Sequence, residues 1–346
     1  MANKTFRILS IDGGGLRGII PVKILQKLEE ITGKRVHEMF DLVAGTSTGG
    51  IISCASVLKG ENGQPKFSLA DIEDIFAKKA GTIFPTARGL KRMILAAENI
   101  ARPGYNPAGL QSVLEDYFDE ERITDTLTPV FVSAYDLNNN RALFFKSRQA
   151  LTDDKVNARM IDVCRATSAA PTIFPAYIFN YDDPKFPNDN PTRMCIDGGV
   201  FINNPEIGAF TEASRFASYP PYNMPNVSND DICILSLGTG HYTSLMTQKQ
   251  GEDWGEIAWA PNISDVMMQA VSHTAEYQGD VLTSDDHHLR VQIAIENEKY
   301  DDLADPSPII REYLLEEVNN QVFNNPIAMA SLNKFIEDAQ LGRGKH

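Results

Sequence analysis

The sequence predicts an α/β fold with a mostly parallel central sheet. Two short apolar segments, Phe6–Ile11 and residues 40–44, have the length and composition of buried strands. A segment of helical character follows each of them, and a strand–helix–strand–helix order is typical of parallel sheets. With 346 residues, of which 42% are hydrophobic, the chain is long enough to form one large core.

The first two helices are expected directly after these strands. Residues 19–31 carry an apolar helical face, with Pro21 in the first turn and Gly33 as a C-terminal stop. Residues 47–58 follow the second strand almost without a loop and are expected to form the second helix. Ser47 therefore stands at a junction between a strand and a helix.

The rest of the chain is expected to add strands to the sheet and helices around it. A helix should begin near Asn106, where apolar residues recur every three or four positions, and the chain beyond about Pro306 should be helical. The segment 180–191 is rich in Asp, Asn and Pro and should be an exposed loop. Further strands are expected at residues 129–135, 142–146, 193–196, 232–237 and 289–295.

The charge balance argues against some partners. Lys and Arg number 32 against 46 Asp and Glu, which gives a formal net charge of −14. Binding of nucleic acid requires a basic surface, so we expect no nucleic-acid partner. An acidic chain is also repelled, on average, by anionic membranes, so membrane contact would need a local basic or apolar patch.

The cysteines and the N-terminus indicate the cellular setting. The four cysteines form no CxxC pair and no metal-ligand pattern is visible, so we expect no metal and no other cofactor. The N-terminus lacks the pattern of a signal peptide, and no segment approaches the about 20 apolar residues of a membrane-spanning helix. A cytoplasmic protein, peripheral at membranes at most, is the expectation.

The pentapeptide GTSTG at residues 45–49 contains a candidate nucleophile. Ser47 lies between a predicted strand and a predicted helix, the placement of the serine in a nucleophile elbow. The helix dipole at that position would stabilise a developing alkoxide. Alternatively, Ser47 is only an N-cap residue, and the pentapeptide by itself leaves both readings open.

The glycine loop at residues 13–15 could bind the negative oxygen of a tetrahedral intermediate. It follows the first strand, and successive backbone N–H groups that face one point can form an oxyanion hole. The same residues, with Gly18, also fit the dinucleotide fingerprint G-x-G-x-x-G. That fingerprint requires an acidic residue at the end of the second strand, whereas Glu29 and Glu30 lie inside a predicted helix. The oxyanion interpretation is therefore favoured.

A serine nucleophile also needs a base. His273 or His288 could complete a Ser–Asp–His order like that of α/β-hydrolases. Asp197 is the other candidate, because it ends a predicted strand and strand ends line the crevice of open α/β sheets. Asp197 could also be a simple turn residue before two glycines. Asp12 is a poorer base, since its carboxylate would lie beside N–H groups intended for an anion.

Three motifs resemble those of the patatin-like phospholipases, which are lipid acyl hydrolases with a Ser–Asp dyad. They are DGGGLRG at residues 12–18, GTSTG at residues 45–49 and DGG at residues 197–199. Three more segments are similar to that family, at residues 126–136, 165–175 and 235–240. The resemblance covers residues 5–300 and implies a three-layer α/β/α sandwich, with residues 301–346 as a helical appendage packed on it.

The resemblance also implies roles for individual residues. Ser47 would be the nucleophile and Asp197 the general base, with no histidine required. The oxyanion hole would be formed by Gly13, Gly14 and Gly15. The supporting motif residues would be Arg17, Gly18, Gly45, Gly49, Gly198 and Gly199.

The implied substrate is a phospholipid or a related glycerolipid, reached by transient contact with a membrane surface. Two other functions are kept as alternatives: an α/β-hydrolase-type esterase with a Ser–Asp–His triad, and a lipid-binding regulatory protein without catalysis. A basic cluster could form an interfacial cap that meets lipid head groups, or it could be an ordinary solvated helix face. Its members are Lys78, Lys79, Arg88, Lys91, Arg92 and Arg102. The oligomeric state is not indicated.

Overall fold

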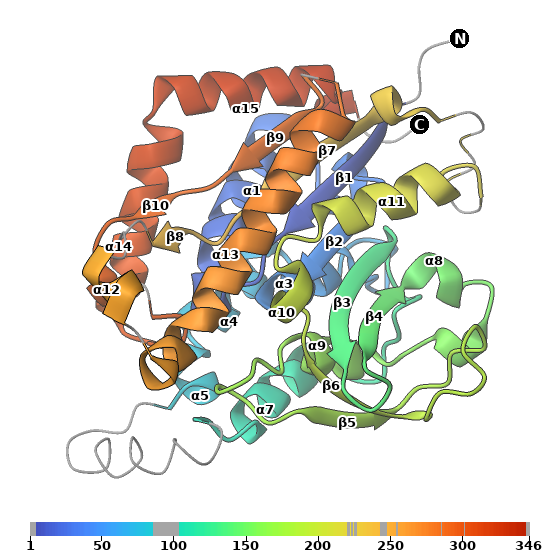
Figure 1. The fold of residues 1–346 in the computed structure, drawn as a ribbon. Helices are drawn as coiled ribbons and strands as arrows, with labels where there is room; N and C mark the ends of the chain where they lie inside the picture. The colour runs from blue at the N-terminus through green and yellow to red at the C-terminus, as the bar shows by residue number, and fades with distance from the viewer. Residues whose placement is uncertain are drawn as a thin grey trace.

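The computed structural model describes residues 5–343 apart from 86–103, 220, 221, 223, 225, 226, 243–247, 254, 285 and 301. The described residues form a mixed sheet of eight strands with helices on both faces (Figure 1). Four of the basic-cluster residues, Arg88, Lys91, Arg92 and Arg102, lie outside the described residues.

The central strands of the sheet are parallel, as the sequence predicts. The strand order is β5-β6-β3-β2-β1-β7-β9, with β4 also paired to β3. The parallel strands are β1 (Phe6–Ile11), β2 (Leu42–Thr46), β3 (Val130–Asp136), β7 (Ile232–Leu237) and β9 (His288–Val291). The antiparallel strands are β4 (Arg141–Lys146), β5 (Tyr177–Asn180) and β6 (Thr192–Asp197).

Side chains on the two faces of β1 belong to different hydrophobic cores, which shows that both faces of the sheet are covered. Phe6 and Ile8 belong to the smaller hydrophobic core, while Leu9 and Ile11 belong to the larger one on the opposite face. The smaller core lies under α11 (Glu206–Phe216), and α10 (Gly199–Ile202) and α13 (Glu256–Leu282) lie on the same side (Figure 1). The three-layer α/β/α architecture is therefore confirmed.

The helices of the larger core include those that carry the candidate site. They are α1 (Ile19–Thr32), α2 (Val36–Met39), α3 (Thr48–Val57), α4 (Leu69–Ala77), α5 (Ala80–Ile83), α7 (Ala108–Tyr117), α8 (Ser147–Ala150), α9 (Met160–Thr167), α14 (Pro308–Val318) and α15 (Pro326–Asp338). The remaining short elements are η1 (Gly15–Gly18), η2 (Asp154–Val156), η3 (Asn229–Asp231), β8 (His241–Tyr242), α12 (Gln248–Asp253), β10 (Ala294–Ile295), η4 (Glu298–Tyr300), η5 (Asn319–Phe323) and η6 (Leu341–Arg343).

One expected strand is divided in two, and one strand was not expected. Residues 289–295 are not one strand, because the side chain of Gln292 turns back and its oxygen accepts hydrogen bonds from the backbone of Gly240 and Ile293. The strand β9 therefore ends at Val291, and the chain resumes as β10 beside β8. The edge strand β5 was not expected, because its four residues are too few to show a strand pattern.

The second strand begins and ends two residues later than predicted, at Leu42 and Thr46, since residues 36–39 form the short helix α2. The segment 180–191 is mostly exposed, but Tyr181 and Asp183 are buried within it. The buried side chains of α14 and α15 belong to the same core as α1. The division of the chain at residue 300 stays a prediction. No helix among the described residues is long and apolar enough to cross a membrane.

Candidate active site

Ser47 occupies a strained turn between β2 and α3. Its backbone has φ 54° and ψ −124°, a conformation that residues other than glycine rarely adopt. The side chain makes no capping hydrogen bond to α3, so the interpretation of Ser47 as an ordinary N-cap is wrong. Its backbone N–H donates to the hydroxyl of Thr167 at 2.8 Å, which helps to hold the turn.

The glycines around Ser47 are required by close backbone approach. A Cβ on Gly45 would lie 2.1 Å from the carbonyl oxygen of Gly49, and a Cβ on Gly49 would lie 2.1 Å from the carbonyl oxygen of Ile11. Because backbone cannot move aside cheaply, no larger residue fits at either position. The turn therefore lies directly against the end of β1, beside the glycine loop.

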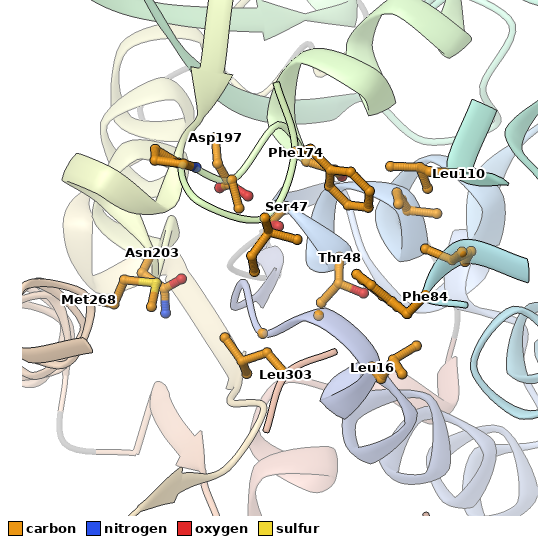
Figure 2. A pocket seen from close by; sticks show the side chains of 18 of the residues that line it. Leu16, Ser47, Thr48, Phe84, Leu110, Phe174, Asp197, Asn203, Met268 and Leu303 are labelled. Atoms are coloured by element: carbon orange, nitrogen blue, oxygen red, sulfur yellow. The ribbon is translucent and has the colours of Figure 1, made fainter. Parts of the chain in front are cut away.

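Asp197 is brought to Ser47 by the register of the sheet. Thr46 pairs with Ser133 on β3, and the next residue of β3, Ala134, pairs with Asp197 at the end of β6. The side chains of Ser47 and Asp197 are neighbours (Figure 2), and a hydrogen bond from the Ser47 hydroxyl acts to lower the pKa of the Asp197 carboxylate. The same carboxylate also accepts a hydrogen bond from the backbone N–H of Gly199 at 2.7 Å.

Gly198 allows the chain to leave β6 at this point. A Cβ on Gly198 would lie 2.3 Å from the hydroxyl of Ser133, and also within 2.6 Å of the Ser133 carbonyl oxygen. Gly198 therefore lets the backbone after Asp197 pass close to β3 before α10 begins.

Burial makes Asp197 a stronger base than an ordinary aspartate. Desolvation raises its pKa to about 6, although the hydrogen bonds from Ser47 and Gly199 oppose the rise. At neutral pH the carboxylate is still mostly ionised, so it is able to accept a proton.

The glycine loop presents two free amide groups and not three. The N–H of Gly13 donates to the carbonyl oxygen of Asn203 at 3.1 Å, so the expectation that Gly13 supplies an oxyanion donor is not met. In the described part of the chain, no protein oxygen accepts from the N–H groups of Gly14 and Gly15. Both residues line the same cavity as Ser47.

A buried ion pair anchors the start of this loop. Arg290 on β9 donates two hydrogen bonds to the Asp12 carboxylate, at 2.8 and 2.5 Å, and both side chains are buried. Asp12 is therefore occupied by a guanidinium group and is not a candidate base. The hydroxyl of Thr239 donates to the carbonyl oxygen of Gly13 at 2.7 Å and fixes the loop from the other side.

Neither histidine that could have completed a triad reaches Ser47. The ring of His288 contacts Asp280 at 2.6 Å and Glu206 at 3.3 Å. Burial lowers its pKa, but these two carboxylates outweigh that effect and raise it above the usual value. His273 lines a different cavity, and no histidine is among the residues that line the cavity of Ser47.

The cavity beside Ser47 is apolar and has a volume of about 350 Å³. Its walls come from α3, α4, α5, α7 and the segment after α9, and they include Ile51 and Phe76. Phe84, Leu110 and Phe174 are further apolar residues of the lining (Figure 2). Such a lining suits an aliphatic chain whose carboxyl end reaches Ser47.

A second, more polar cavity of about 450 Å³ adjoins the first. The residues that line both cavities are Gly14, Ile173, Asn203, Met268 and Leu303, so the cavities meet at the glycine loop. The polar residues that line the second cavity are Asp12, Arg17, Asn203, Thr239, His241, Gln269, Ser272, His273, Gln292 and Asp302. An apolar and a polar compartment therefore meet at the same point near Ser47.

Comparison with known proteins decides the family. The model of the family described as patatin-like phospholipase matches residues 9–210, and all three motifs lie in that range. The chain belongs to the patatin-like phospholipase family. "Patatin-like protein 1" of Oryza sativa subsp. indica is 34% identical, over 82% of this chain and 73% of the relative.

Other relatives qualify what family membership implies. A potato (Solanum tuberosum) protein named "Probable inactive patatin-3-Kuras 1" is 28% identical over 82% of this chain and 78% of its own length. Among solved structures, VipD from Legionella pneumophila aligns with 96% of this chain and 67% of its own, with a TM-score of 0.40 and 12% identity. The patatin-like family is one of lipid acyl hydrolases, but its members include a protein named as inactive.

Sequence reasoning missed several residues that support this patatin-like site. Arg290 and Asn203 hold the glycine loop, yet neither belongs to a local motif. Thr167 holds the serine turn and lies in the patatin-like segment 165–175, but that segment gave no role for it. Two residues of the basic cluster lie in the described part of the chain, and both form ion pairs at the surface. Lys78 pairs with Asp74, and Lys79 pairs with Asp116.

Proposed function

We propose that this protein hydrolyses carboxylic esters of phospholipids or related glycerolipids, with Ser47 as nucleophile and Asp197 as general base. The observation that carries the proposal is the hydrogen bond between the Ser47 hydroxyl and the buried Asp197 carboxylate. It joins a strained serine turn to a base whose pKa is raised, at the end of an apolar cavity.

The reaction would proceed through an acyl-enzyme. The ester carbonyl would lie near Ser47 with its oxygen toward the N–H groups of Gly14 and Gly15. The Ser47 oxygen attacks the carbonyl carbon while Asp197 takes the hydroxyl proton, and the departing alcohol then receives that proton. Asp197 next takes a proton from water, whose oxygen attacks the acyl carbon. The bond from the acyl carbon to the Ser47 oxygen then breaks, Asp197 returns the proton to that oxygen, and the fatty acid is released.

Asp197 does not have to supply the whole rate enhancement. Each oxyanion donor typically contributes about 100- to 1,000-fold in rate, and Gly14 and Gly15 offer two. The N-terminus of α3 adds a favourable dipole at Ser47. A base with a pKa near 6 is therefore sufficient in this setting, where an ordinary aspartate near 3.8 would be weaker.

The two cavities suggest how a lipid would be placed. The acyl chain would occupy the apolar cavity, and the polar head group would occupy the cavity lined by Arg17, His241 and His273. The ester bond between them would then lie at Gly14 and Ser47, where the two cavities meet. A cytoplasmic location with peripheral membrane contact stays a prediction.

The two alternatives have less support. A Ser–Asp–His triad would require a histidine at Ser47 or Asp197, but His288 contacts Glu206 and Asp280 instead. A lipid-binding protein without catalysis would not require the serine turn to be strained or Asp197 to bond to it.

Labelling and hydrolysis together test the proposal. A fluorophosphonate probe should label the wild type. It should label Asp197→Asn more slowly than the wild type, and it should not label Ser47→Ala. Hydrolysis of a soluble short-chain ester should be lost in both variants and kept in His273→Ala. Full activity in Asp197→Asn together with loss in His273→Ala would reject the dyad in favour of a triad.

A further inference from the structure

The helix α13 (Glu256–Leu282) has one side that packs on the protein. Ser272, Ala275 and Gly279 are buried, and the helix contacts α10, α11 and β9 (Figure 1). The Ser272 hydroxyl also accepts a hydrogen bond from the amide of Asn203, at 3.1 Å, which ties α13 to the glycine loop. The position of the helix beside the site is therefore fixed.

The opposite side of α13 is apolar and exposed. Residues spaced three, four or seven positions apart lie on one face of a helix, and this face spans about 27 Å from residue 263 to 281. We call it the α13 face. Its apolar side chains and their exposed fractions are Ile263 43%, Val266 39%, Met267 46%, Tyr277 69% and Val281 66%.

The α13 face is continuous with the cavity of Ser47. Met267 is exposed on this face and also lines the apolar cavity. Its neighbour Met268 lines both the apolar and the polar cavity (Figure 2). The α13 face therefore reaches the wall of the apolar cavity that contains Ser47.

The charge around α13 selects among lipid surfaces. Residues 250–289 contain no Lys and no Arg, but eight Asp and Glu residues. A membrane-surface helix that binds anionic lipids usually carries Lys and Arg on its polar side. This region would instead be repelled by an anionic surface, in line with the net charge of −14.

We propose that the α13 face is the surface by which this protein docks on zwitterionic or uncharged lipid, with the mouth of the Ser47 cavity against the bilayer. A lipid surface is favoured over a second protein copy because the face runs into a cavity suited to an aliphatic chain. The docking proposal rests on the proposed function only in one respect, namely that the substrate is a lipid ester. It also differs from the expectation that the basic cluster around residues 78–102 meets the lipid head groups.

Vesicle binding tests the docking separately from catalysis. In a Ser47→Ala background, the protein is cosedimented with vesicles of phosphatidylcholine alone or with added phosphatidylglycerol. Replacing three exposed side chains (Ile263→Ser, Tyr277→Ser and Val281→Ser) should weaken binding to phosphatidylcholine by at least about tenfold, because each inserted apolar side chain adds favourable transfer free energy.

A matched control removes exposed apolar side chains elsewhere. Ile309 and Ile327 are 58% and 78% exposed on α14 and α15. Their replacement by serine should leave vesicle binding within about twofold, since surface substitutions outside a contact have small effects. With Ser47 intact, the triple α13 variant should hydrolyse a soluble short-chain ester at the wild-type rate.

The lipid preference has its own gain-of-function test. Gln278→Lys places a cation at an exposed position of α13 beside the α13 face and should increase binding to vesicles with phosphatidylglycerol by about fivefold. Binding to phosphatidylcholine should change little.

Several results would overturn the proposal. One is a triple α13 variant that binds phosphatidylcholine as the wild type does. Another is tighter binding of the wild type to anionic vesicles. A third is the finding, by sedimentation, that the wild type is a dimer and the triple α13 variant is a monomer, while both bind vesicles equally well. Loss of ester hydrolysis with docking intact would instead reject the proposed function and leave the docking surface standing.

Discussion

Replacing Asp197 by asparagine should abolish activity and make the protein more stable. The carboxylate is buried, and burial raises its pKa from 3.8 to about 6. At about 1.4 kcal/mol per pH unit, this rise corresponds to about 3 kcal/mol. Above pH 6 the free energy of unfolding is lower by this amount, because the folded protein keeps Asp197 ionised in a buried position. Asparagine has the same shape and can still accept from the Gly199 N–H, but it has no charge to desolvate.

The sign of the pH dependence follows from the direction of the pKa change. Above about pH 6 both the folded and the unfolded chain have Asp197 ionised, so the full difference of about 3 kcal/mol applies. As the pH falls from about 6 to 4, the folded protein takes up the proton first and the difference disappears. The stability advantage of Asp197→Asn should therefore be largest at pH 8 and absent near pH 3.5.

Two measurements check this prediction. Urea unfolding of wild type and Asp197→Asn at several pH values gives the difference in free energy of unfolding. Hydrolysis of a soluble ester gives the activity, which should fall by about 100-fold or more in the variant because the general base is lost. For the wild type, kcat/KM should decrease about tenfold per pH unit below pH 6.

The reasoning would be refuted by a variant that is less stable than the wild type at pH 8 by more than about 1 kcal/mol, since the carboxylate would then be a net stabilising group. It would also be refuted by an activity profile of the wild type without an inflection between pH 5 and 7. Ser47→Ala is the control, because it removes activity but keeps the buried carboxylate.

Three further predictions concern the support of the site. Arg290→Met should lower the free energy of unfolding by about 3–5 kcal/mol, because Asp12 stays buried without its partner, and adding Asp12→Asn should recover most of this loss. An unrestored double variant would contradict the ion-pair argument. Gly49→Ala should lower the melting temperature strongly, because its Cβ would lie 2.1 Å from a β1 carbonyl oxygen. Gly81→Ala is the control and should have little effect, because its Cβ would meet no neighbouring atom within 4 Å. Equal effects of the two substitutions in thermal unfolding would argue against the close approach. His273→Ala should raise KM for a phospholipid and leave hydrolysis of a short-chain ester unchanged, and equal effects on both substrates would contradict a head-group role for the polar cavity.

The sequence by itself determined the strands of the parallel core and the local chemistry of the site. Buried strands leave continuous apolar runs, so β1 and β7 were predictable to the residue. The turn at Ser47 was also predictable, because close approach of backbone allows only glycine at Gly45 and Gly49 and so leaves a mark in the sequence. These features depend on residues that are neighbours in the chain.

The tertiary structure alone decided what those local features contact. Arg290 holds Asp12 across 278 positions, and Asn203 takes the N–H of Gly13 that the glycine motif had suggested for an oxyanion. The register of β2, β3 and β6 brings Asp197 to Ser47, while His288 is held by Glu206 and Asp280. Such contacts depend on strand order and on register, and a local sequence pattern carries neither, because both are set by how distant segments pack.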